Sequence, residues 1–128
     1  MIDHVSVGVA SLETSRRFYD AALRPLGVVR TVDSAVESDY GWAPGSLGVE
    51  FTVTSYPGGT SPSLGSHICF RAPDRRAVEA FHGAALAAGG RDEGAPGLRP
   101  QHHANYFAAF VLDPDGHRIE AVCHAPEV

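Results

Sequence analysis

Apolar residues alternate with polar or small ones at the start of the chain. Within residues 2–9, one face of an extended chain carries Val5, Val7 and Val9, and the other carries His4, Ser6 and Gly8. This period of two predicts a half-buried strand. The spacing of apolar residues then becomes helical, in a segment that Ser11 can cap and that Pro25 and Gly27 end. Further strands are predicted at 28–33, 35–41 and 47–54.

The same order of elements then repeats. Shifting the chain by 63 residues places His4 on His67, residues 18–23 on 81–86, and Gly27 on Gly90. Matches in a strand, a helix and a helix-ending glycine, all at one offset, indicate a duplicated unit. The second unit has predicted strands at 66–72, weakly at 91–93, and at 105–112 and 117–123, with a helix at 74–88 that Asp74 opens. The last two strands are joined by a tight turn, Asp113-Pro-Asp-Gly116.

The duplicated unit predicts an α+β fold. Two βαβββ modules, at about residues 1–56 and 66–124, form open, curved, mixed sheets around a central pocket. They belong to one domain, residues 1–128, and are joined by a Pro/Gly/Ser-rich linker at 57–66. A second irregular stretch, 94–104, is too long for a tight turn and is expected to cover the pocket.

Strand alternation places four potential metal ligands on the polar faces of their strands: His4, Glu50, His67 and Glu120. Helices must cover the more apolar face of each strand, so these side chains should turn away from the helices. If the two sheets curl around a cavity, two imidazoles and two carboxylates converge. That set suits a divalent ion such as Zn, Ni, Fe, Co or Mn. Solvent-facing histidines and exposed strand-edge glutamates are the ordinary alternative.

Composition and charge narrow the class of partner. The formal net charge is -5, whereas nucleic-acid binding usually needs a basic face. No apolar run is long enough to cross a membrane. The two cysteines, Cys69 and Cys123, make no disulfide framework, and their apolar settings predict buried, reduced thiols in a cytoplasmic protein.

Three segments carry a family resemblance: Ile2-Asp-His-Val5, Ser15-Arg-Arg-Phe-Tyr-Asp20 and, above all, Asp113-Pro-Asp-Gly-His-Arg-Ile-Glu120. With them the whole chain resembles the vicinal oxygen chelate superfamily, which includes glyoxalase I, fosfomycin-resistance proteins, extradiol dioxygenases and bleomycin-resistance proteins. The resemblance implies that His4, His67 and Glu120 are metal ligands, and it places Glu50 near the fourth ligand of glyoxalase I. It also implies a substrate that chelates the metal through two neighbouring oxygens, with Glu50 or Glu120 as the catalytic proton carrier.

Other side chains are candidates for substrate contact. Arg71 shares the strand face of His67. The stretch 101–106 contributes His102, His103 and Tyr106, which can line the mouth of the pocket or form a solvated loop. Trp42 is a further candidate, although a buried aromatic core is its more ordinary role.

Three functions remain open. The first is a metal-dependent lyase or isomerase of glyoxalase type acting on a small oxygen-bearing substrate. The second is a metal-dependent dioxygenase or thiol transferase, and the third is a small-molecule binding protein of bleomycin-resistance type without chemistry. The family's habit and the open sheet edges together predict a homodimer.

Overall fold

The computed structural model describes residues 1–42, 50–59 and 61–127. Its first module consists of β1 (Val5–Val9), α1 (Leu12–Leu23), a 3₁₀ turn (Arg24–Leu26), β2 (Val28–Asp33), β3 (Glu37–Trp42) and β4 (Phe51–Ser55). The second consists of β5 (Ile68–Arg71), α2 (Arg75–Ala87), β6 (Arg91–Leu98), β7 (Phe107–Leu112) and β8 (Arg118–Cys123). The expected strand at 47–54 begins at Phe51, and residues 43–49 lie outside the described residues.

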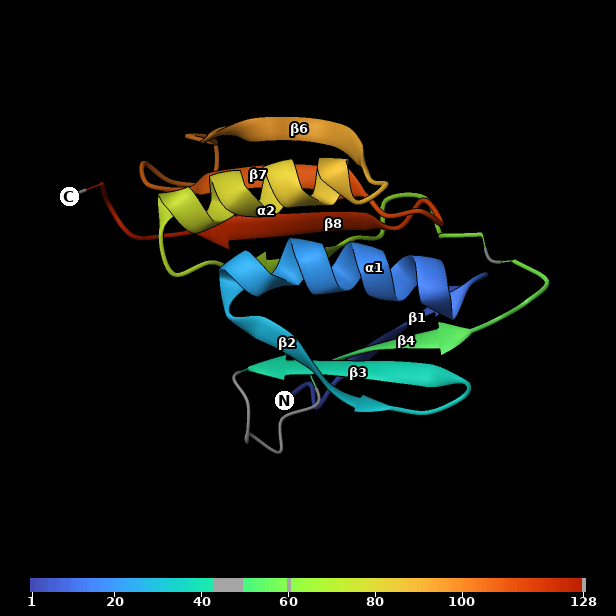
Figure 1. Ribbon diagram of the computed structural model, residues 1–128. Helices are drawn as coiled ribbons and strands as arrows, with labels where there is room; N and C mark the ends of the chain where they lie inside the picture. The colour runs from blue at the N-terminus through green and yellow to red at the C-terminus, as the bar shows by residue number, and fades with distance from the viewer. Residues whose placement is uncertain (43–49, 60, 128) are drawn as a thin grey trace.

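Each module forms a four-stranded sheet with the same topology. The strand orders are β1-β4-β3-β2 and β5-β8-β7-β6. The first strand of each module pairs in parallel with the last one, and the other pairings are antiparallel. Two βαβββ units with open, mixed sheets are therefore present, and the α+β fold class is confirmed (Figure 1).

Local sequence signals account for the start of both helices and for the end of the first helical segment. The Ser11 Oγ accepts a hydrogen bond from the Thr14 N–H at 3.2 Å, and the Asp74 Oδ1 accepts one from the Ala77 N–H at 2.8 Å. Such a cap stabilises a helix by about 1 kcal/mol. Gly27 adopts a left-handed conformation, with φ of 82°, which ends the first helical segment at little steric cost. None of the described helices is long and apolar enough to cross a membrane.

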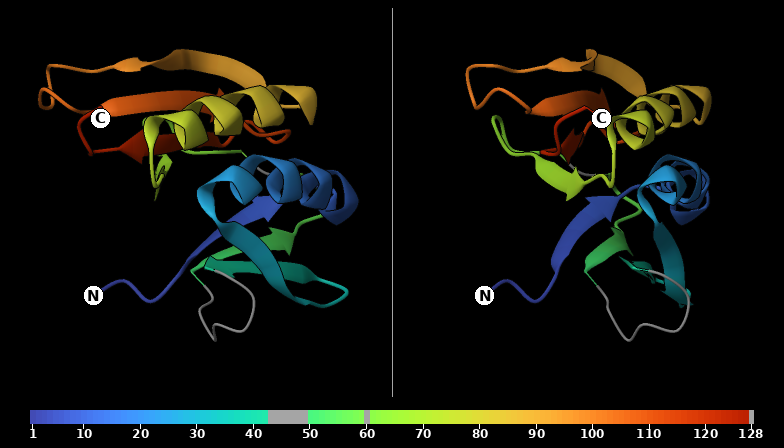
Figure 2. Two further views of the ribbon diagram at one scale, coloured as in Figure 1. Left: turned by 60° about the vertical axis from the view of Figure 1, so that its left-hand side comes forward. Right: turned by 90° about the vertical axis from the view of Figure 1, so that its left-hand side faces the viewer.

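One core joins the two modules. Helices α1 and α2 lie side by side, each on its own sheet (Figures 1 and 2), and their buried residues belong to a single apolar cluster. The turn between β7 and β8 adds polar links to the first module. Its Asp113 Oδ2 accepts a hydrogen bond from the Tyr19 hydroxyl at 2.6 Å, and the His117 Nε2 lies 2.6 Å from the Gly8 carbonyl oxygen. The turn at residues 113–117 thus connects the second module to the first through polar contacts.

Strand β6 differs from the prediction. A weak strand was expected at 91–93 and irregular chain at 94–104, but β6 runs from Arg91 to Leu98. The strand contains Gly94, Pro96 and Gly97, which are unfavourable inside a central strand, yet β6 is an edge strand whose pairing register shifts at both glycines. Edge strands accommodate proline and bulges because one side of the strand needs no ladder partner. The irregular part between β6 and β7 is therefore confined to residues 99–106.

Candidate functional site

His67 and Glu120 meet on the face of the second sheet that α2 does not cover. Glu120 alternates along β8 with the core residues Ile119 and Ala121, so its side chain points to the other face. His67 directly precedes β5, the parallel neighbour of β8. Its Nε2 lies 3.0 Å from the Glu120 Oε1. The Glu120 side chain is 2% exposed and that of His67 is 39% exposed, so the pair is reached from the imidazole side.

Tyr106 holds the second oxygen of the same carboxylate. Its hydroxyl donates to the Glu120 Oε2 at 2.6 Å. Desolvation, followed by the hydrogen bond and the charge of Glu120, raises the pKa of the Tyr106 phenol well above its ordinary value. The phenol therefore remains a protonated donor near neutral pH. The other oxygen, Glu120 Oε1, is the one that lies 3.0 Å from the His67 Nε2.

The spacing of the pair fits two ligands of one metal ion. Donors that lie about 2.0–2.2 Å from an ion are about 3.4 Å apart at the tetrahedral angle that zinc prefers, and about 3 Å apart at the right angle of a six-coordinate site. The His67 Nε2 and Glu120 Oε1 match the second of these spacings at 3.0 Å. Across residues 1–42, 50–59 and 61–127, no group of three His, Cys, Asp or Glu side chains is placed to hold an ion. Among the described residues, the pair therefore offers two potential metal ligands and no third.

His4 and Glu50 lie at the first sheet instead. Each directly precedes its strand, β1 or β4, and the Val5 N–H donates to the Glu50 carbonyl oxygen at 3.0 Å. The His4 Nδ1 lies 2.6 Å from the Asp3 Oδ1, and the Glu50 Oε2 accepts a hydrogen bond from the Trp42 N–H at 3.3 Å. Figure 2 shows the N-terminal end extending away from the second sheet. Within one chain, two of the predicted ligands therefore lie at the first sheet and two at the second.

Strand pairing clarifies the position of Glu50. Val5 pairs with Phe51 in the first module, and Ile68 pairs with Ile119 in the second. By the repeat, Thr52 corresponds to Glu120, and Glu50 corresponds to Arg118. The Thr52 hydroxyl donates to the Asp39 Oδ1 at 2.8 Å, so the first module has no carboxylate at the position of Glu120. Glu50 is exposed beside His4 rather than at the equivalent of a ligand position.

The predicted substrate contacts fall into two groups. His102 and His103 pack against Tyr106, with ring centroids 4.6 and 5.6 Å away, so they lie next to the residue that holds Glu120. The His103 Nε2 also lies 2.8 Å from the Nδ1 of His124. Arg71 and Trp42 line a separate groove of about 460 Å³. His124 borders that groove too and connects the two groups.

Cys69 shares the face of His67 and Glu120, and strand alternation could have found it. It pairs in register with Glu120. The prediction of two buried thiols is wrong for Cys69, which is exposed, and holds for Cys123. Desolvation of the thiol, followed by the charge of Glu120, raises the pKa of Cys69 to about 12. At neutral pH this side chain is a neutral thiol rather than a thiolate ligand.

Replacing Tyr106 by phenylalanine tests the support of Glu120. The change leaves the Oε2 of a buried carboxylate without its 2.6 Å donor while keeping the aromatic ring. Loss of a residue that supports a metal ligand typically lowers metal affinity by about 10–100-fold. We expect a loss in that range, measured by competition with a chelating dye, and no loss for Tyr56→Phe, since Tyr56 is exposed. Equal affinities in the two variants would show that Tyr106 does not support the site.

Comparisons with known proteins agree with this fold. The family model described as Glyoxalase/Bleomycin resistance protein/Dioxygenase superfamily matches residues 1–121. No curated protein matches the chain. Among solved structures, a glyoxalase/bleomycin resistance protein from Albidiferax ferrireducens T118 is 34% identical with a TM-score of 0.83, and the match covers 97% of this chain and 98% of that one.

Two further structures show how widely the fold is shared. Glyoxalase I from Zea mays is 25% identical with a TM-score of 0.74, over 95% of this chain and 45% of the maize chain. The fosfomycin resistance protein FosX from Listeria monocytogenes is 15% identical with a TM-score of 0.70, over 98% of this chain and 93% of that one, and it shares the fold alone. Because the family model spans nearly the whole sequence, the chain belongs to the glyoxalase/bleomycin resistance protein/dioxygenase superfamily.

Proposed function

We propose that this protein is a metal-dependent enzyme of the glyoxalase type, a lyase or isomerase that acts as a cytoplasmic homodimer on a small substrate with two neighbouring oxygens. The observation that carries the proposal is the 3.0 Å approach of the His67 Nε2 to the Glu120 Oε1. A carboxylate that is 2% exposed is costly unless donors or a cation compensate it. Tyr106 compensates one oxygen, and the other faces an imidazole that solvent reaches.

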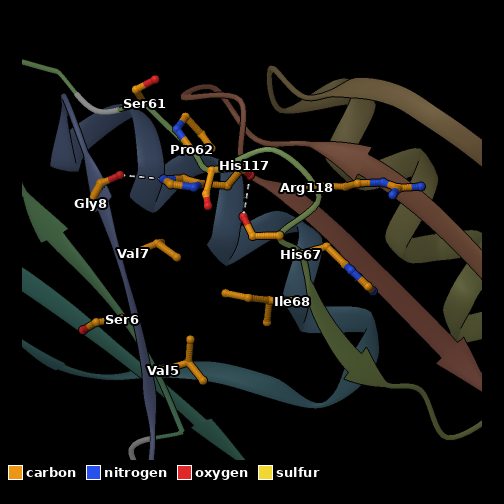
Figure 3. Close-up of a pocket in the computed structure, with 12 residues that line it drawn as sticks. Val5, Ser6, Val7, Gly8, Ser61, Pro62, His67, Ile68, His117 and Arg118 are labelled. Atoms are coloured by element: carbon orange, nitrogen blue, oxygen red, sulfur yellow. Dashed lines mark hydrogen bonds between the residues drawn. The ribbon is translucent and has the colours of Figure 1, made fainter.

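The third ligand in this proposal is His4 of the partner subunit. Strands β1 and β5 are both edge strands, and the groove between them, of about 470 Å³, is lined by Val5 and Val7 on one side and by His67, Ile68 and Arg118 on the other. Figure 3 shows the His67 side chain projecting away from β1 of its own chain. In this proposal, the first module that approaches His67 from the open face belongs to a second copy. An unpaired edge also invites such pairing.

In this proposal, separate residues hold the metal ion, carry the proton and contact the substrate. His67, Glu120 and His4 of the partner subunit hold the ion (Zn, Ni, Fe, Co or Mn), and Tyr106 orients Glu120. A bound ion supplies Lewis-acid stabilisation of negative charge on the substrate oxygens. Glu50, exposed beside His4, enters the site with it and carries a proton without binding the ion. His102, His103, Arg71 and Trp42 contact the rest of the substrate.

Metal analysis with a reaction assay tests the proposal. Protein purified without chelator is expected to contain about one equivalent of zinc or nickel per chain and to isomerise an adduct of a 2-oxoaldehyde with a thiol. Iron together with oxygen uptake would instead identify a dioxygenase. Protein that neither retains nor takes up a divalent ion, yet binds small molecules, would be a binding protein and would overturn the proposal.

A further inference from the structure

Two arginine side chains contact the Phe110 ring on the face of the second sheet that α2 does not cover. Phe110 lies on β7, opposite Glu120 in the pairing with β8. The guanidinium carbon of Arg118 lies over the ring, 4.4 Å from its centroid, and that of Arg99 lies 5.7 Å away. The His67 ring is 6.0 Å from the same centroid. Two arginines thus share a neighbour with the proposed metal ligand.

The position of Arg99 depends on the irregular edge strand. Its guanidinium folds back over β6 and donates to the carbonyl oxygens of Gly97 at 2.8 Å and Ala95 at 2.9 Å. A Cβ atom at Gly94 would come within 3.3 Å of the Arg99 Nη2, and one at Gly97 within 3.2 Å of its Nη1. These distances are tighter than ordinary contacts, so the two glycines leave room for the guanidinium. They are the same glycines at which the pairing register shifts.

Both arginines retain unused charge and hydrogen-bonding capacity. The Arg118 Nε is buried and has no hydrogen-bond partner. In the described part of the chain, neither Arg118 nor Arg99 forms a salt bridge. The Glu120 oxygens are already engaged by His67 and Tyr106. The protein has a net charge of -5, so two arginines without salt bridges on one face make the local electrostatic potential more positive than that of the protein as a whole.

We propose that Arg118 and Arg99 bind an anionic group of the substrate, a carboxylate, phosphonate or phosphate, next to His67 and Glu120. This inference rests on the proposed function and names its substrate class: a small anion whose charged group lies beside the two chelating oxygens. A guanidinium lying over an aromatic ring keeps its N–H donors in its own plane, where they fit the paired oxygens of such anions. Arg118 projects to the same side as His67, away from β1 (Figure 3).

Anion titration of the full-length protein, freed of metal, tests the inference at constant ionic strength. The probes are acetate, methylphosphonate and inorganic phosphate, followed by NMR, and they separate a carboxylate site from a phosphonate or phosphate site. Arg118→Gln and Arg99→Gln are each expected to raise the dissociation constant of the preferred probe about tenfold or more, as for a lost charged hydrogen bond. Arg91→Gln removes an exposed arginine of the same sheet and should leave it unchanged.

The Gly97→Ala variant distinguishes specific anion binding by a positioned Arg99 from nonspecific electrostatic attraction. The added Cβ would lie 3.2 Å from the Arg99 Nη1 and shift the guanidinium slightly while the net charge stays the same, so anion binding should weaken by less than in Arg99→Gln. Equal affinities in the wild type and the arginine variants would overturn the inference, as would anion binding that falls as much in Arg91→Gln. Dissociation of the dimer in Arg118→Gln, with no anion bound by the wild type, would show that the arginines pair with a second copy.

Metal content measured on the same variants keeps the two proposals apart. Arg118→Gln and Arg99→Gln should retain the metal that His67 and Glu120 hold. If the arginines bind an anion but the protein takes up no metal, the anion site would be supported and the proposed metal-dependent enzyme would be overturned. A metal-binding protein that is indifferent to all three probes would leave the enzyme standing without the anion site.

Discussion

Alanine in place of His67 is expected to abolish stoichiometric metal binding while the protein stays folded. The imidazole is 39% exposed and forms no part of the apolar core, but its loss leaves the buried Glu120 Oε1 without its 3.0 Å neighbour, at a cost of about 1–3 kcal/mol. Metal affinity should fall by more than about 100-fold, because loss of a residue that only supports a ligand already costs about 10–100-fold. Titration of the metal-free protein with zinc or nickel, followed by calorimetry, measures the change.

Matched variants show whether the effect belongs to the site. Glu120→Gln should reproduce the loss, since it removes the charge of the other ligand. His82→Ala is the control, because His82 on α2 contacts Asp92 and lies outside the site. Glu50→Gln should retain the metal and lose turnover, in keeping with the position of Glu50 beside His4. If Glu50→Gln lost metal as His67→Ala does, Glu50 would be a ligand and the role given to it here would be wrong.

The sequence predicted what depends on local patterns. Capping by Ser11 and Asp74 and the helix end at Gly27 follow from the preferences of neighbouring residues. Alternation also placed His67 and Glu120 on one face of the second sheet. The same parity applied to Cys69 and Arg118, so the signal for both was present in the sequence. Strand β6 was largely missed because its glycines and proline are breakers in a central strand but are tolerated at an edge.

Relations between distant segments could not be predicted in this way. The contact of Tyr106 with Glu120 depends on the path of the loop at 99–106, for which no periodic pattern exists. The correspondence between Thr52 of the first module and Glu120 of the second depends on the register between β1 and β4. Above all, alternation assigns a side chain to a face of its own sheet but does not say which other sheet that face meets. His4 and His67 have the expected parity, yet among the described residues of one chain no third ligand joins His67 and Glu120.

Because His4 lies at the first sheet and His67 at the second, the second expected result is rescue of metal binding by mixing two inactive variants. If each site combines His4 of one subunit with His67 of the other, His4→Ala and His67→Ala homodimers both carry two defective sites. A mixed dimer places both substitutions in one site and leaves the other intact. Mixed dimers isolated with two affinity tags should therefore bind about one metal ion, half the wild-type amount, and random mixtures should reach about a quarter of it.

The alternative arrangement has a different outcome. If each site lay within a single chain, every subunit of a mixed dimer would still lack one ligand, and mixing would restore nothing. Sedimentation of the mixture shows whether dimers form. This control is needed because monomers would also fail to complement each other. The intact site of the mixed dimer should bind metal with wild-type affinity, since it contains unaltered His67 and Glu120 from one chain and His4 of the partner subunit. Restored stoichiometry together with restored affinity would place the first module of one copy against the uncovered face of β5 and β8 in the other.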